Sequence, residues 1–147
     1  MGKRSDYIND GYTEEGFVAA VPGLHGELRF TFRPFTVEER AQVTNGLRNV
    51  QPHLHNRKYA IEAAKKITAW SLRDGADKPV EVKADTVYAI RPALFDRLID
   101  ILLGYKPSDI DPQWAEAKKD EAVEDQFQAA LAGTSIGQLA EEANEKN

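Results

Sequence analysis

The sequence predicts an α+β protein that is mostly helical, with an N-terminal β-hairpin packed on about three main helices and an acidic helical C-terminal arm. Three observations lead to this class. Residues 27–33 alternate strictly between polar and apolar side chains, as a strand with one covered face does. Residues 92–103 carry apolar side chains at helical spacing, and acidic side chains accumulate after residue 108.

Composition excludes several classes of protein. The chain of 147 residues contains no cysteine, which rules out a disulfide framework, a thiolate zinc site and a cysteine nucleophile. No segment approaches the ~18 consecutive apolar residues of a membrane span, and the first residues lack the apolar stretch of a signal peptide. We therefore expect a cytoplasmic protein with no membrane partner.

Charge is distributed unevenly along the chain. The formal net charge is -5, yet residues 109–147 contain ten acidic residues and three lysines, which leaves +2 for the first 108 residues. We expect a loose N-terminal lead-in over residues 1–16, a compact α+β domain over residues 17–108, and an acidic helical arm and tail over residues 109–147. The net negative charge argues against a nucleic-acid partner.

The hairpin is predicted from a short apolar run, a turn and an alternating segment. Phe17–Val21 is apolar, Pro22–Gly26 is rich in turn-forming residues, and the alternation of residues 27–33 comes next. Leu28, Phe30 and Phe32 should face the core.

Two helices are predicted next. Thr36 and Glu39 have the spacing of a capping box, so a helix should begin there and extend to about residue 50, with four residues on its buried face: Val37, Ala41, Thr44 and Leu47. A second helix should cover about residues 54–73, because Tyr59, Ala63, Ile67 and Trp70 recur at helical spacing.

The next segments alternate between turns and helices. Residues 74–79 are a turn cluster, residues 80–82 should be extended, and residues 85–90 should form one or two helical turns. A helix should begin at Pro92 and stop at Gly104. Its inward side chains are Leu94, Phe95, Leu98, Ile101 and Leu102.

The C-terminal arm is the candidate partner-binding region. A linker with two prolines over residues 105–112 precedes a predicted helix over about residues 113–132, whose apolar set is thin. Such a helix packs only partly on its own domain, and a solvated acidic face is the simpler interpretation of its charge. Four side chains are the candidate partner-binding residues: Trp114, Val123, Phe127 and Leu131.

No pattern predicts catalysis or a bound cofactor. There is no nucleophile elbow and no glycine-rich phosphate loop, and the paired carboxylates lie on predicted helix surfaces. His53 with His55 lacks a third metal ligand. Two acidic pairs, Asp74 with Asp77 and Asp109 with Asp111, are better interpreted as turn residues than as calcium ligands. We expect no enzymatic activity, no metal and no cofactor.

One alternative concerns the basic residues of the hairpin. Arg29 and Arg33 alternate with Phe30 and Phe32, as on some surfaces that stack single-stranded nucleic acid. The same alternation is expected of any strand with one solvent-facing side, and this simpler interpretation is favoured.

Several segments together resemble tail assembly chaperones of tailed bacteriophages. The resemblance is carried by Leu-Arg-Phe-Thr-Phe-Arg-Pro-Phe (28–35), Ala-Trp-Ser-Leu-Arg-Asp-Gly (69–75), Lys-Pro-Val-Glu-Val (78–82), Ile-Arg-Pro-Ala-Leu-Phe-Asp-Arg-Leu (90–98) and Ser-Asp-Ile-Asp-Pro (108–112). It lies in the order of a hairpin, a segment ending in Trp with an Asp-Gly turn, a Pro-Val strip and a helix started by proline.

The resemblance implies a non-enzymatic role in tail assembly. Such a protein binds the long helical tape-measure protein, or another tail protein, and keeps it soluble in the cytoplasm of the bacterial host while the tail forms. We expect the segment from Trp114 to Leu131 to cover an apolar stripe of this partner. The alternative is a structural virion protein, such as a head–tail connector or a tail-tube accessory subunit, and a homo-oligomer stays open.

Overall fold

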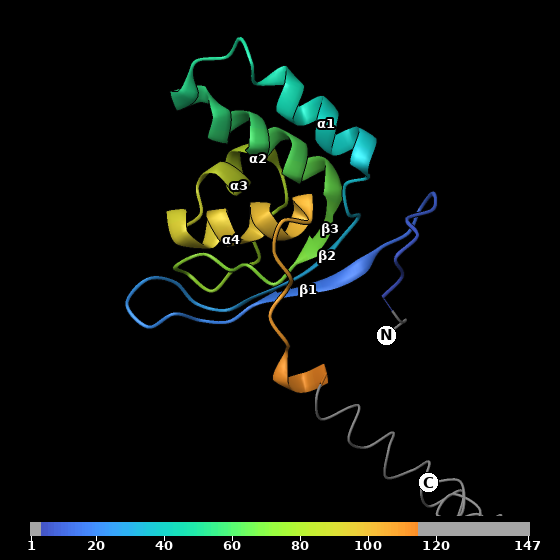
Figure 1. Ribbon diagram of the computed structural model, residues 1–147. Coiled ribbons are helices and arrows are strands. Elements are labelled where there is room, and N and C mark those ends of the chain that lie inside the picture. The colour runs from blue at the N-terminus through green and yellow to red at the C-terminus, as the bar shows by residue number, and fades with distance from the viewer. Residues whose placement is uncertain (1–3, 115–147) are drawn as a thin grey trace, which may run out of the picture. The chain divides into compact units, whose positions relative to one another are not determined.

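The computed structural model describes residues 4–114. The chain divides into two compact units, Met1–Ile110 and Asp111–Asn147. The first unit contains one antiparallel sheet of three strands in the order β1-β2-β3, with helices on one of its faces (Figure 1). The α+β class is therefore confirmed. Among the described residues, no helix has the length and apolar character needed to cross a bilayer.

The predicted hairpin is confirmed. Strand β1 (Glu14–Val18) pairs with β2 (Leu28–Phe32), so β1 begins within the segment expected to be a lead-in. Leu28, Phe30 and Phe32 are 0%, 2% and 2% exposed. The ring of Phe30 lies over Gly16, its cross-strand partner, so closely that a Cβ at position 16 would lie 2.3 Å from a ring carbon. Glycine is thus required there by packing.

The helix expected over residues 54–73 is wrong in its last third. Helix α2 (His55–Lys66) ends where the chain becomes strand β3 (Ile67–Trp70), which pairs with β2. Helical spacing counted Ile67 and Trp70 as two further turns. The second edge of β2 offers unpaired backbone groups, and the β-branched and aromatic side chains of Ile67, Thr68 and Trp70 favour a strand. Tertiary pairing therefore outweighs the local helical pattern.

Helix α1 (Val37–Gly46) confirms the capping box but not the expected buried face or the expected end. Thr36 Oγ1 accepts a hydrogen bond from Glu39 N, and Glu39 Oε1 accepts one from Thr36 N. No residue of α1 is buried, and Val37 is 78% exposed. Leu47, just beyond the helix, is buried. The reason is that α1 lies on the outer side of α2 (Figure 1), far from the sheet.

The remaining elements largely agree with their predictions. A short helix, η1 (Pro52–Leu54), precedes α2, and α3 (Ala84–Tyr88) supplies the expected helical turn. Residues 80–82 are extended, and Val80 N donates to Leu72 O over 3.0 Å. Helix α4 (Pro92–Leu103) ends at Gly104, which has a φ of 83°. It buries seven side chains: Leu94, Phe95, Leu98, Ile99, Ile101, Leu102 and Leu103.

The second unit is described only at its start. Its backbone is helical from Pro112 to Trp114, and Asp111 Oδ1 accepts a hydrogen bond from Gln113 N over 2.9 Å. Asp111 therefore caps a helix start, as expected of a turn residue. The rest of the predicted arm lies outside the described residues.

Candidate binding surfaces

The expected partner-binding residues are only partly described. Trp114 is half-buried in the last helical turn that the structure describes. Val123, Phe127 and Leu131 lie outside the described residues. The set therefore remains a prediction based on the sequence.

The segment expected to be a linker is fixed to the outer edge of β1. Ser108 Oγ accepts a hydrogen bond from Phe17 N over 2.7 Å, and Asp109 N donates to Phe17 O over 2.9 Å. Asp109 Oδ2 accepts from Ala19 N over 2.9 Å. These bonds pair backbone groups that an edge strand would otherwise expose.

A salt bridge joins this junction to α4. Arg97 Nη2 donates to Asp109 Oδ1 over 2.7 Å, and both side chains are partly buried. We expected Asp109 to bond its own turn, and this expectation is wrong, because its carboxylate bridges β1 and α4. We call Ser108 and Asp109, with their partners Phe17, Ala19 and Arg97, the edge clamp.

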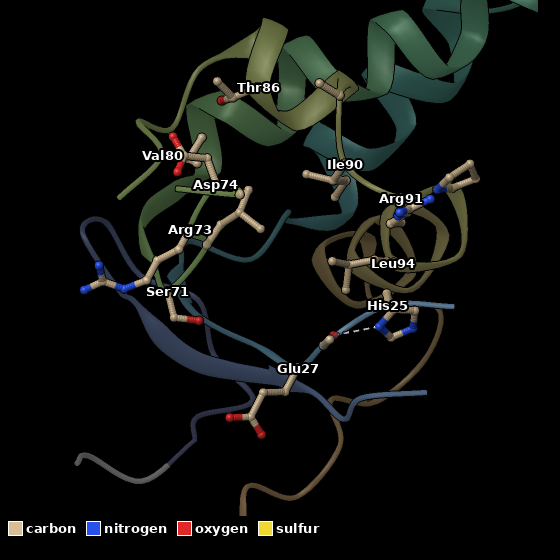
Figure 2. Close-up of a pocket in the computed structure, with 15 residues that line it drawn as sticks. His25, Glu27, Ser71, Arg73, Asp74, Val80, Thr86, Ile90, Arg91 and Leu94 are labelled. Carbon is tan, nitrogen blue, oxygen red and sulfur yellow. Dashed lines mark hydrogen bonds between the residues drawn. The ribbon is translucent and has the colours of Figure 1, made fainter. Parts of the chain in front are cut away.

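An open groove lies beside the junction between α3 and α4. Its volume is about 910 Å³, within the range of clefts that hold ligands. Its lining comes from the hairpin loop, the segment after β3, and the α3–α4 junction. Figure 2 shows Ile90 and Leu94 near its centre, with Arg91 and His25 on one side and Ser71 on the other.

The acidic side chains of this groove already have partners. Glu27 Oε1 pairs with Arg29 Nη1 over 2.8 Å. Asp74 Oδ1 accepts hydrogen bonds from Ala76 N and Lys78 N over 2.8 Å and 3.0 Å, so the predicted turn role of Asp74 is confirmed. Neither carboxylate is available to a positively charged ligand without giving up these bonds.

A second, smaller hollow contains the buried Lys66. It has a volume of about 230 Å³ and lies between residues 8–12 and the start of α1. Lys66 Nζ donates to Glu39 Oε2 and lies 5.1 Å from the centre of the Phe35 ring. Burial by itself raises the pKa of Glu39, but hydrogen bonds from Lys66 and from Thr36 N outweigh it and hold that pKa below its ordinary value.

This arrangement is an internal ion pair rather than a reactive pair. Both groups are charged near neutral pH, since the carboxylate has a lowered pKa and the ammonium is stabilised by its partner. A general base needs a raised pKa close to the working pH. The pair therefore ties α1 to the end of α2.

The histidines do not come together around a ligand. His55 Nε2 lies 2.9 Å from Val50 O, whereas His53 is exposed in η1. His25 Nδ1 lies 2.7 Å from Gly26 O in the hairpin loop. In the part of the chain from residue 4 to residue 114, no three His, Asp or Glu side chains gather as they would around a metal ion.

The basic side of the hairpin faces outward, as its alternation predicts. The guanidinium of Arg29 lies 5.1 Å from the centre of the Phe17 ring and pairs with Glu27. Arg33 lies at the rim of the smaller hollow. The aromatic residues between them, Phe30 and Phe32, face the core and are not available for stacking on bases.

Sequence reasoning missed both the edge clamp and the groove. Each joins segments far apart in the chain, such as Phe17 with Ser108, and no local periodicity signals such a contact. The one usable signal was Arg91-Pro92, which marks a helix start whose first amides have no carbonyl partner within the helix.

Comparison with known proteins gives no relative. No family model matches the chain, and neither do any curated proteins or solved structures. The argument for function therefore depends on the residues and their geometry.

Proposed function

We propose that this chain is a non-enzymatic tail assembly chaperone of a tailed bacteriophage, which binds the long helical tape-measure protein and keeps it soluble during tail morphogenesis. It acts in the cytoplasm of the bacterial host and is absent from the finished particle. The proposal is supported by the resemblance carried by residues 28–112, by the edge clamp and by the sequence of residues 109–147.

The observation that carries the proposal is the position of the edge clamp directly before an acidic segment. The clamp fixes Ser108 and Asp109 to β1 and α4, and residues 109–147 have a large excess of acidic side chains. A compact body that holds the origin of a charged segment is suited to presenting that segment to another protein.

The sequence of this segment suits an apolar helical partner. Val123, Phe127 and Leu131 are spaced four residues apart, so a helix would place them on one face. A tape-measure helix with an exposed apolar stripe aggregates unless the stripe is covered. Apolar side chains on one face could cover it while neighbouring carboxylates keep the complex hydrated.

The test is co-purification of the tagged full-length chain from phage-producing cells, with mass spectrometry of its partners and of purified virions. We expect recovery of one very long helical protein and absence of this chain from particles. A Phe127→Asp variant should lose the long partner, whereas a Lys118→Gln variant should retain it.

Two results would contradict the proposal. Stoichiometric presence in the virion would identify a structural subunit, such as a head–tail connector or a tail-tube accessory protein. Equal recovery of the partner by both variants would show that the C-terminal segment does not bind it.

A further inference from the structure

The groove beside the α3–α4 junction combines an apolar floor with uncompensated positive charge. Leu72, Val80, Ile90 and Leu94 supply apolar lining, and the groove is open to solvent. The carboxylates of Glu27 and Asp74 are occupied by other groups. The charge that a ligand would meet is therefore set by the basic side chains and the helix end.

Arg91 is the basic side chain nearest to the centre of the groove. It is exposed, and within residues 4–114 its guanidinium has no salt bridge or hydrogen bond to an acidic group. Arg73 differs, because Arg73 Nη1 donates to Asp77 O over 2.8 Å. Figure 2 shows the Arg73 side chain extending away from Leu94, on the side opposite to Arg91.

The start of α4 adds to this positive region. No side chain caps the helix, Pro92 occupies its first turn, and Phe95 N is bonded to Arg91 O over 2.9 Å. The amides of Ala93 and Leu94 precede Phe95, so neither has a carbonyl acceptor within the helix. The positive end of the helix dipole points in the same direction as these amides.

We propose that this groove docks an apolar peptide segment of a partner protein that carries a carboxylate beside its apolar run. The carboxylate binds at Arg91 and the start of α4, and the apolar side chains pack on Leu72, Ile90 and Leu94. A nucleic acid is disfavoured because its phosphates would leave the apolar floor uncovered. The inference goes beyond the proposed function, which assigns binding to the C-terminal segment.

The test uses the full-length chain and two synthetic fluorescein-labelled peptides. Both carry leucines at helical spacing. One has glutamates in its first turn, and the other has glutamines there. Fluorescence anisotropy should show that the wild-type chain binds the glutamate peptide about tenfold more tightly, since a charge-assisted hydrogen bond contributes an effect of that order.

Three variants locate the binding. Arg91→Gln should remove the preference for the glutamate peptide, and Ala89→Glu, at an exposed position in the groove lining, should weaken binding of both peptides. Arg48→Gln is the matched control, because Arg48 is an exposed arginine outside the groove. Circular dichroism and thermal unfolding should show that all three variants are folded.

Several outcomes would overturn the proposal. These are equal binding of the two peptides, an Arg48→Gln effect as large as that of Arg91→Gln, or groove-dependent self-association without peptide binding. The last result would make a second copy of the chain the occupant. None of these variants alters residues 109–147, so a failure here leaves the co-purification test of the proposed function unaffected.

Discussion

Helices α4 and α1 have similar lengths but are held in place by different interactions. Helix α4 buries seven of its twelve residues, whereas α1 buries none of its ten. In α4 the apolar face lies against the sheet and α2. In α1 the contacts to the rest of the protein are concentrated in a few polar side chains.

The contacts of α1 are specific and lie mainly near its start. The capping box joins Thr36 to Glu39, and Glu39 pairs with Lys66 of α2. Arg40 Nη1 donates to Leu103 O over 3.3 Å, and its guanidinium lies 5.0 Å from the centre of the Tyr105 ring. The comparison shows that one helix is stabilised by desolvating apolar surface and the other by a small number of directional bonds.

The largest expected effect is in α4. Leu98 is 0% exposed, so Leu98→Ala should lower the free energy of unfolding by about 3 kcal/mol, through lost burial and the cavity left behind. Urea unfolding measures this difference. Asp96→Ala, on the exposed side of the same helix, is the control and should change stability by less than about 0.5 kcal/mol. Similar losses in both variants would contradict the difference between the helices.

The ion pair of α1 should make stability depend on acid. The pKa of Glu39 lies below its ordinary value of 4.5, so its contribution is full above that pH and is lost as the pH falls through the lowered pKa. Glu39→Gln should cost about 1–2 kcal/mol near neutral pH, less than for a fully buried pair because the Glu39 side chain is 40% exposed.

The check on this prediction is a series of urea midpoints from about pH 7 down to about pH 3. Wild type and Glu39→Gln should converge at the acidic end. A constant difference across the series would show that the carboxylate charge does not provide the stabilisation.

Loss of the other half of the capping box should be smaller. Thr36→Ala removes the acceptor for Glu39 N and should cost about 1 kcal/mol, while Thr36→Ser should retain most of the stability. Thermal unfolding of the two variants distinguishes the cap from a general effect of the position. Equal destabilisation by serine and alanine would indicate that the methyl group, rather than the hydroxyl, matters.

The smallest effect is expected at Val37. Because this side chain is 78% exposed and lies at the positive end of α1, Val37→Glu should leave stability within about 0.5 kcal/mol of wild type. Leu47→Ala should cost about 2 kcal/mol, since Leu47 is only 7% exposed. A large loss at Val37 would restore the buried face that the sequence suggested.

The sequence predicted best where a local pattern and a tertiary environment agree. The alternation of residues 27–33 produced β2, the capping box produced the start of α1, and Pro92 with Gly104 bounded α4. Of the candidate partner-binding residues, only Trp114 is described, so the sequence remains the sole basis for the other three. The groove and the edge clamp could not be predicted, because their residues come from segments separated along the chain.

The sequence by itself therefore determined the hairpin, the caps and the core face of α4, since each depends on residues that are close neighbours in the chain. Tertiary structure decided that residues 67–70 form a strand, that α1 faces solvent, and that Ser108 and Asp109 bind β1. The physical reason is that an open sheet edge leaves backbone donors and acceptors unpaired. Any nearby segment that pairs with them gains more than its own local preference would provide.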